Sequence, residues 1–415
     1  MRYSTDLSFE HNSLIHCWVF GFKINHLLFV DEIRSYPYSI MSSLVNSTSK
    51  VDSSRIMLLT NRLQDSPTGG RELLCKLNHD ILTSIYRERL VLFELPRTRL
   101  QGLVSLIKVF SGHIDGVSDE IIAKSLQTIR FEHVEKVFVD GSNLGGIVKV
   151  IKQNLPNVEV CTFFHNIETR FFFGSLRQNK TLRGLAVLVV NYLAERKSVI
   201  YSDKIICLSE RDSCMLRKVY GRDATHISPI ALQDKLPQGG SQTLIAPVEK
   251  FVLFVGGNFY ANRVGIAWFV KHVVPHLSIK TCIVGKGFDD LRPELEQEGK
   301  VEVIGAVDSL AQWYRRSHFV IAPIFEGSGM KTKVAEALMF GKKIIGTPEA
   351  FSGYEQFAKR TGWVCTTAEE FVAAIDRAQK MDLKVFDPEM RELYEKTYSF
   401  PVVQSRYADI LGSVV

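Results

Sequence analysis

Residues 324–338 read IFEGSGMKTKVAEAL and follow an apolar run of strand length at 319–323. Gly327 and Gly329 allow the backbone to approach a ligand closely. The helix expected after them presents unpaired N–H groups and the positive end of its dipole, and Lys331 and Lys333 add positive charge. The segment is therefore typical of a phosphate-binding turn between a strand and a helix. The alternative is a glycine-bearing turn with solvated lysines.

Two more glycine turns follow apolar runs in the same part of the chain. Gly256 and Gly257 come directly after residues 251–255, and Arg263 lies six residues further on. Lys286 stands between two glycines after the next apolar run. Because the carboxyl ends of parallel strands share one edge of a doubly wound sheet, we expect the three turns to form one site. Arg263 could reach a diphosphate there, or it could be a surface arginine beside a plain tight turn.

Short apolar runs alternate with segments of helical period along the chain, which predicts parallel β/α units. Their near-continuous apolar character predicts strands covered on both faces. A first set is expected at 56–60, 90–95, 137–140, 158–164, 205–209 and 226–230, and a second at 251–255, 281–284, 301–304, 319–323, 343–347 and 363–365.

The two sets predict an α/β protein with two doubly wound, Rossmann-like domains. Residues 233–247 are rich in Gly, Pro, Ser and Gln and mark the boundary. We expect domains at 55–235 and 236–389, an N-terminal extension of uncertain structure at 1–54, and helices at 390–415 that pack back on the first domain.

The composition fits a globular, multidomain protein and excludes general disorder. The chain has 415 residues, of which 46% are hydrophobic and 23% charged, with a formal net charge of +6 that suits an anionic ligand. Its 7 cysteines are scattered and lack a Cys-x-x-Cys pair, so a zinc site or a disulfide framework is not predicted. The apolar runs are too short to cross a bilayer. These features predict a cytoplasmic protein with at most peripheral membrane contact.

The second half of the chain resembles a known family. The segments FVGGNFYANRVGIAWF, CIVGKG, VEVIGAVDSLAQWYRRSHFVIAPIFEGSGMKTKVAEALMFGKKIIGT and AFSGYE, within residues 251–355, are similar to the donor domain of family 4 glycosyltransferases. In the first half SPTGGRELL, FHNIETRFF and SDKIICLSERD followed by SPIAL resemble the family more faintly. The resemblance implies the GT-B fold, in which two such domains face each other across a cleft.

The resemblance also implies a reaction and its site. A sugar would pass, with retention of its anomeric configuration, from a nucleotide diphosphate donor on the second domain to an acceptor on the first. Arg263 and Lys333 would neutralise the diphosphate, Glu336 would hold the ribose, and Glu326 would face the sugar. Nine residues separate Glu326 from Glu336 where the family commonly has seven, which makes the role of Glu326 less certain. The implied donor-binding set is Gly256, Gly257, Lys286, Ser328, Gly329, Met330, Lys331 and Glu336.

His165 ends an apolar run in the first half, and the family places a polar group near the donor sugar at this position. It therefore joins Arg263, Lys333 and Glu326 as a predicted catalytic residue, although a strand-end histidine is often structural. Gly69, Gly70 and Arg71 begin a helix and could contact the sugar acceptor or the donor phosphates, or they could be an ordinary helix start.

The sequence predicts no metal and no cofactor besides the nucleotide sugar as co-substrate. Charge that develops on the leaving diphosphate must be stabilised by groups already in place. No two aspartates have the Asp-x-Asp spacing by which many sugar transferases hold a metal, so lysine, arginine and a helix N-terminus would substitute. We name no protein base, because in the implied reaction the departing phosphate oxygen can accept the proton.

Residues 170–197 carry six cations against one acid, Glu195, and begin with Arg170 and three phenylalanines. Such a segment can lie on anionic lipid, which would suit a lipid-linked glycan as the sugar acceptor. The alternative is a long helix on the sheet with a solvated basic edge.

The resulting prediction is a glycosyltransferase that acts on a surface polysaccharide or glycolipid. Two alternatives stay open: a noncatalytic GT-B-like partner that binds nucleotide sugar or glycan, and a nucleotide-sugar epimerase of similar architecture. A nicotinamide dehydrogenase is disfavoured because no Gly-x-Gly-x-x-Gly follows the first strand of either domain. Nucleic acid is disfavoured as a partner because the charge is modest and no recognised module is present.

Overall fold

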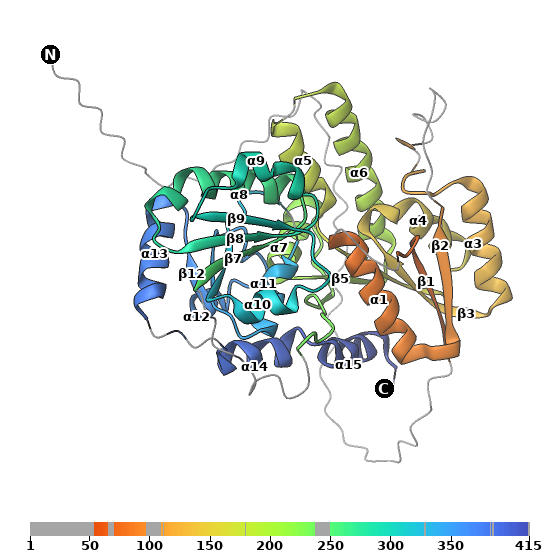
Figure 1. Ribbon diagram of the computed structural model, residues 1–415. Helices are drawn as coiled ribbons and strands as arrows, with labels where there is room; N and C mark the ends of the chain where they lie inside the picture. Colours follow the sequence, from red (N-terminus) through yellow and green to blue (C-terminus); the bar gives the residue numbers. More distant parts are fainter. Residues whose placement is uncertain are drawn as a thin grey trace, which may run out of the picture. The chain divides into compact units, whose positions relative to one another are not determined.

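The computed structural model describes residues 54–64, 70–96, 109–110, 112–178, 180–236, 250–327, 329–381, 383 and 386–413. They contain two six-stranded sheets, each with helices packed beside it (Figure 1). Every strand pairs in parallel with its neighbours. The predicted α/β fold with two doubly wound sheets is therefore confirmed.

The first sheet has the strand order β2-β1-β3-β4-β5-β6. Its strands are β1 (Arg55–Asn61), β2 (Leu90–Leu95), β3 (Val134–Asp140), β4 (Glu159–Phe164), β5 (Lys204–Cys207) and β6 (His226–Ile227). Its helices are α1 (Gly70–Tyr86), α3 (Asp119–Phe131), α4 (Gly145–Asn154), α5 (Glu168–Gln178), α6 (Leu182–Tyr201) and α7 (Glu210–Tyr220), with 3-10 turns η1 (Arg87–Arg89) and η2 (Ser142–Leu144). The order in which successive strands are added reverses between β1 and β3, and a crevice is expected at the carboxyl ends of these two parallel strands.

The second sheet has the order β12-β11-β10-β7-β8-β9, which is the Rossmann order read from its other edge. Its strands are β7 (Phe251–Val255), β8 (Lys280–Val284), β9 (Val301–Gly305), β10 (Phe319–Ala322), β11 (Ile344–Gly346) and β12 (Gly362–Val364). Its helices are α8 (Tyr260–His272), α9 (Arg292–Leu295), α10 (Ala311–Arg316), α11 (Thr332–Met339), α12 (Ala358–Thr361) and α13 (Ala368–Lys380), with η3 (Val274–His276) and η4 (Asp289–Leu291). The switch point lies between β7 and β10.

The central strands are buried along their whole length, as near-continuous apolar runs require. Every residue of β7 and of β10 is buried. Helices therefore cover both faces of the sheet, and ligands can reach its strands only at their ends.

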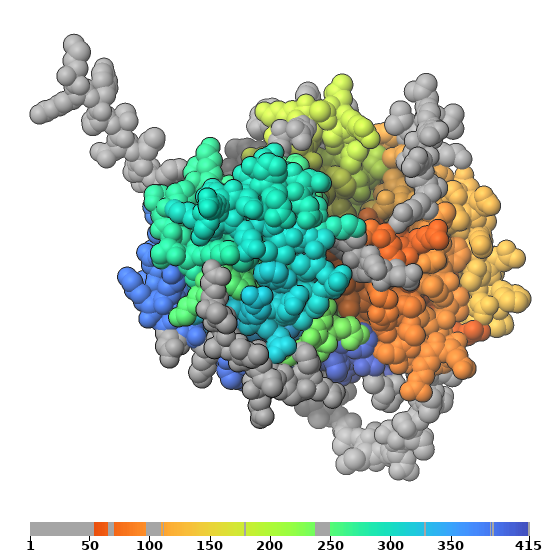
Figure 2. Space-filling model, in the orientation of Figure 1, coloured from red at the N-terminus to blue at the C-terminus, as the bar shows by residue number. Residues whose placement is uncertain are grey.

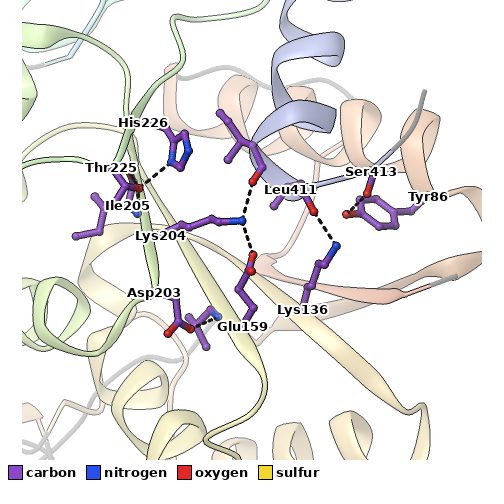
Figure 3. Close-up of polar contacts among 12 residues, drawn as sticks. Tyr86, Lys136, Glu159, Asp203, Lys204, Ile205, Thr225, His226, Leu411 and Ser413 are labelled. Atoms are coloured by element: carbon purple, nitrogen blue, oxygen red, sulfur yellow. Dashed lines mark hydrogen bonds and ion pairs between the residues drawn. The ribbon is translucent and has the colours of Figure 1, made fainter. Parts of the chain in front are cut away.

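The chain returns to the first domain after the second. Helices α14 (Pro388–Thr397) and α15 (Phe400–Leu411) follow α13, and α15 packs against α1. The Tyr407 hydroxyl donates a hydrogen bond of 2.6 Å to Asn78 Oδ1. Lys136 Nζ and Lys204 Nζ donate to the carbonyls of Leu411 and Ile410, at 2.7 and 2.8 Å (Figure 3). These lysines satisfy carbonyls that the end of α15 leaves unpaired.

The predicted limits of the domains stay a prediction. Most of the boundary segment 233–247, and the extension 1–54 apart from Ser54, lie outside the described residues.

Candidate functional site

The three predicted glycine turns lie together at the carboxyl edge of the second sheet. The Gly256 amide donates to the Val284 carbonyl at 3.0 Å, which joins the turn after β7 to the end of β8. A Cβ on Gly285 would lie 1.7 Å from the Gly256 carbonyl oxygen, and Gly285 has a φ of +152°. Only glycine therefore lets these two turns approach so closely. The backbone N–H of Asn258 completes the contact by donating to the Lys286 carbonyl at 2.9 Å.

Lys333 lies in the first turn of α11 and is buried, with 7% of its surface exposed. Its Nζ donates to Asn262 Oδ1 at 2.7 Å and lies 4.5 Å from the centre of the Phe254 ring. A Cβ on Gly256 would come within 3.0 Å of the same Nζ, so the turn after β7 also borders it. No carboxylate forms an ion pair with Lys333 in the part of the chain that the structure describes.

Burial controls the charge of this lysine. It lowers the pKa of Lys333 to about 7, and the neighbouring Lys331 acts in the same direction, while the charge of Glu336 only partly opposes the shift. The two oxygens of Glu336 are engaged elsewhere: Tyr314 donates its hydroxyl to one at 3.2 Å, and Lys235 Nζ lies 3.3 Å from the other. The ammonium group is therefore desolvated without the anion that would stabilise it.

Lys331, the second lysine of the turn, is already neutralised. Its Nζ lies 3.0 Å from Glu349 Oε1 and donates to the Gly329 carbonyl at 2.8 Å. Glu349 also binds two arginines of the first domain, Arg211 at 2.8 Å and Arg170 at 3.5 Å. Glu349 therefore links the turn before α11 to α5 and α7. Lys333, the other lysine here, has no acidic partner among the described residues.

Glu326 and Arg263 lie at the surface. The Tyr260 hydroxyl forms a hydrogen bond with Glu326, and Tyr260 is also close enough to Arg263 to be influenced by its charge. Lys333, by contrast, is buried. The predicted residues therefore differ in their exposure to solvent.

His165 follows β4, at the carboxyl edge of the first sheet. Its Nε2 lies 2.6 Å from Oδ1 of Asp140, which is fully buried at the end of β3. Thr60 and Asn78 each donate to Asp140 at 2.8 Å. Burial alone would raise the pKa of Asp140, but His165 and the other donors lower it to about 2. A buried carboxylate therefore fixes the ring of His165.

Three potential metal ligands meet at the same point. Ligand atoms of Cys75, Asp140 and His165 all lie within 4.8 Å of one another. Burial, followed by the charge of Asp140, raises the pKa of the Cys75 thiol, so it stays protonated and bonds to Asp140. Because Asp140 and the facing nitrogen of His165 are already bonded to each other, the geometry favours a hydrogen-bonded network over a metal centre.

A cavity of about 110 Å³ lies between the carboxyl edges of the two sheets and is lined by residues of both domains. Gly329 has a φ of +65°, and a Cβ on it would lie 2.7 Å from the His165 carbonyl oxygen. The turn before α11 therefore touches the end of β4 directly. The lining residues are Gly70, Arg71, Leu74, His165 and Asn166 of the first domain and Gly329, Met330 and Thr332 of the second.

Two predicted site residues, Gly69 and Ser328, lie outside the described residues. Sequence reasoning missed Asn262, Asp140 and Glu349. Asp140 had a signal, because it ends β3 as His165 ends β4, and neighbouring parallel strands end at one edge. No sequence motif marks Glu349, whose partners lie on α5, on α7 and in the turn before α11.

Comparison with known proteins identifies part of the chain. Residues 249–380 match the family described as Glycosyl transferases group 1. The second domain is therefore similar to this family. No curated protein matches the sequence.

Several solved structures are similar to this chain across both domains. Sucrose-phosphate synthase from Thermosynechococcus elongatus is similar, with a TM-score of 0.64 and 15% identity over 86% of this chain and 98% of that one. HepE of Anabaena in complex with UDP has a TM-score of 0.61 and 14% identity over 87% and 100%. The lipopolysaccharide outer core galactosyltransferase WaaB has a TM-score of 0.58 and 11% identity over 86% and 99%. The fold is therefore GT-B, as predicted.

The contact between the domains can be tested at Gly329. In Gly329→Ala the new methyl group must displace the His165 carbonyl, in addition to the cost of about 1–2 kcal/mol for a positive φ. Gly299→Ala is the matched control, because Gly299 has a φ of +72° but open space around its Cβ. We expect a larger loss of unfolding free energy for Gly329→Ala in denaturant titrations, and faster amide exchange after β4. Equal losses and unchanged exchange would contradict the contact.

Proposed function

We propose that the protein is a glycosyltransferase that uses a nucleotide diphosphate sugar as donor. The observation that carries the proposal is the buried Lys333 ammonium, which has a neutral amide and an aromatic ring as partners but no acid. A diphosphate at the carboxyl edge of the second sheet would supply the missing anion. HepE of Anabaena, which shares the fold, is known in complex with UDP and with UDP-glucose.

The residues support a division of labour in the transfer. When the bond between sugar and diphosphate breaks, negative charge develops on the leaving group. Lys333 and the N-terminus of α11 lie where they would receive that charge, and Lys331 would add to it if the diphosphate displaced Glu349. His165, held by Asp140 at the edge of the first sheet, would contact the transferring sugar. Glu326 and Arg263 would border the site from the solvent side.

The finer features of the activity rest on the resemblance to family 4. They are retention of anomeric configuration, independence of metal ions, and a role in building a surface polysaccharide or glycolipid. An acceptor glycan would enter along the first domain. In this proposal Lys333 and the helix N-terminus carry out the charge stabilisation for which other sugar transferases use a metal.

The protonation of Lys333 gives a direct test. Its lowered pKa leaves it largely neutral at pH 8, and a bound diphosphate raises the pKa again, so binding takes up a proton. We expect calorimetry in buffers of different ionisation enthalpy to show uptake of nearly one proton per nucleotide at pH 8, where the free diphosphate is fully ionised. UDP, GDP and ADP are compared, and the tightest binder is used.

The variant Lys333→Met should lose this proton uptake and bind roughly 10- to 100-fold more weakly, because a charge-assisted hydrogen bond is removed. Lys359→Met, a change at an exposed lysine of the same domain, should behave like the wild type. Unchanged affinity in Lys333→Met would refute the proposed donor site.

We also propose that α5 and α6 rest on an anionic membrane, at its cytoplasmic face. Phe173 is 51% exposed and Leu182 is 88% exposed, and Arg177 and Arg183 are close by in the sequence. Figure 2 shows the yellow-green segment that contains α6 on the visible surface of the molecule. Exposed apolar side chains among cations suit a lipid interface. No described helix is long and apolar enough to cross the bilayer, so this contact would be peripheral.

Flotation with vesicles tests the membrane contact. The protein should float with phosphatidylglycerol vesicles at low salt and not with phosphatidylcholine vesicles. Replacing Phe173 and Leu182 by serine should reduce the bound fraction several-fold, because their apolar surface no longer enters the lipid. Phe131→Ser, at a 79% exposed phenylalanine on α3, is the control. If the wild type fails to float, the membrane contact is wrong.

A further inference from the structure

A polar cluster surrounds Arg71 at the carboxyl edge of the first sheet. Arg71 Nη2 donates to Asp115 Oδ2 at 2.8 Å and to Asn143 Oδ1 at 3.3 Å. Asn143 in turn donates to Asp115 Oδ2 at 2.6 Å, which closes a triangle of three side chains. The positive charge of Arg71 is thus matched within the protein, in contrast to that of Lys333.

Glu168, the first residue of α5, adds a second negative charge beside Arg71. It is only 9% exposed, and its carboxylate accepts no hydrogen bond from the described residues. Its backbone N–H donates to Glu195 Oε1 at 2.9 Å, which fixes its place at the helix start. Glu195 differs, because Tyr220 donates to it at 2.7 Å and the Thr169 amide at 3.1 Å. A nearly buried carboxylate without a donor points to a missing ligand.

Asn166 supplies a second unsatisfied atom nearby. Its Oδ1 is buried without a hydrogen-bond partner, and the residue lines the cavity together with Arg71 and His165. Asn166 Oδ1 and the carboxylate of Glu168 accept hydrogen bonds, whereas the buried Nε of Arg71, which also has no partner, donates one. The ligand that completes the site must therefore bring donors together with an acceptor, as hydroxyl groups do. It should also lack negative charge, because Asp115 already pairs with Arg71 and no described cation forms an ion pair with Glu168.

We propose that Glu168 and Asn166 bind hydroxyl groups of an uncharged sugar acceptor, so that the enzyme selects an unphosphorylated acceptor. This inference rests on the proposed function, since it takes the first domain to be the acceptor side. Sugar hydroxyls supply the donors that both side chains lack, and a hydrogen bond to a carboxylate is stronger than one to a neutral oxygen. An acceptor phosphate would be repelled by the surrounding carboxylates.

The charge of Glu168 gives the site a pH dependence. Burial raises the pKa of Glu168 to about 7; Arg71 opposes this shift, and Glu195 and Asp115 reinforce it. The carboxyl group is therefore ionised mainly above pH 7, and binding of the sugar acceptor strengthens as the pH rises through that value. Binding of a diphosphate at Lys333 has the opposite dependence.

The test measures acceptor binding to the full chain by saturation-transfer NMR and calorimetry, with and without UDP. The probes are the methyl glycosides of glucose, galactose, mannose and N-acetylglucosamine, set against glucose 6-phosphate and mannose 6-phosphate. We expect at least one glycoside to bind, and Glu168→Gln to weaken it about tenfold or more. Glu210→Gln, at the exposed first residue of α7, should leave glycoside binding unchanged.

Several outcomes would overturn the inference. They are tighter binding of a hexose phosphate than of its methyl glycoside, unchanged glycoside binding in Glu168→Gln, and failure of every glycoside to bind. Thermal shifts with UDP report separately on the donor site and should be the same in wild type and Glu168→Gln. A wild type that binds glycosides but no nucleotide would refute the proposed function and leave the acceptor site standing.

Discussion

The candidate site depends on one interaction, the burial of the Lys333 ammonium group at the carboxyl end of the second sheet. Lys333 reaches this place because α11 begins beside the turn after β10, and Asn262 of α8 orients its Nζ. A buried charge without a counter-charge costs free energy in the unliganded protein. An anion that bound there would recover this cost and raise the pKa of Lys333 again, and the Nζ is already in position for a leaving group. Stability has been exchanged for a prearranged electrostatic site.

The two sides of the cavity carry complementary chemistry. The second domain offers a cation without an anion, and the first offers hydrogen-bonding groups of Asn166, Glu168 and Arg71 that lack partners. Gly329 brings the turn before α11 against the end of β4, and Glu349 ties the same turn to Arg211 and Arg170. A nucleotide diphosphate and a polyhydroxyl acceptor would therefore meet where the two sheets face each other. The opposed ionisation of Lys333 and Glu168 would favour both substrates together only near neutral pH.

Much of this architecture is predictable from the sequence, because buried parallel strands leave a local apolar signal. All twelve strands lie where apolar runs were followed by turns. The glycine turn that begins at residue 324 and the two turns beside it were also predictable. Glycine leaves a visible signal in the sequence where two turns approach as closely as Gly285 and Gly256 do. The resemblance to a family supplied the expected roles, and the residues that would carry them stay proposals.

The sequence could not predict which side chains contact each other, because these contacts depend on how separate elements pack. Arg263 and Lys333 were both expected to neutralise a diphosphate, which stays a prediction, whereas the contact between Asn262 and Lys333 had no signal in the sequence. Asp140 meets His165 through the alignment of two strands, and Glu349 gathers partners from α5, α7 and the turn before α11. No local pattern encodes contacts that depend on how separate elements pack.

A crystal structure with the tightest-binding nucleoside diphosphate would test the central claim most directly. The account predicts a β-phosphate oxygen within hydrogen-bond distance of Lys333 Nζ, at the start of α11 and beside the Gly256 turn. A nucleotide bound elsewhere, with Lys333 still paired to Asn262 alone, would contradict it.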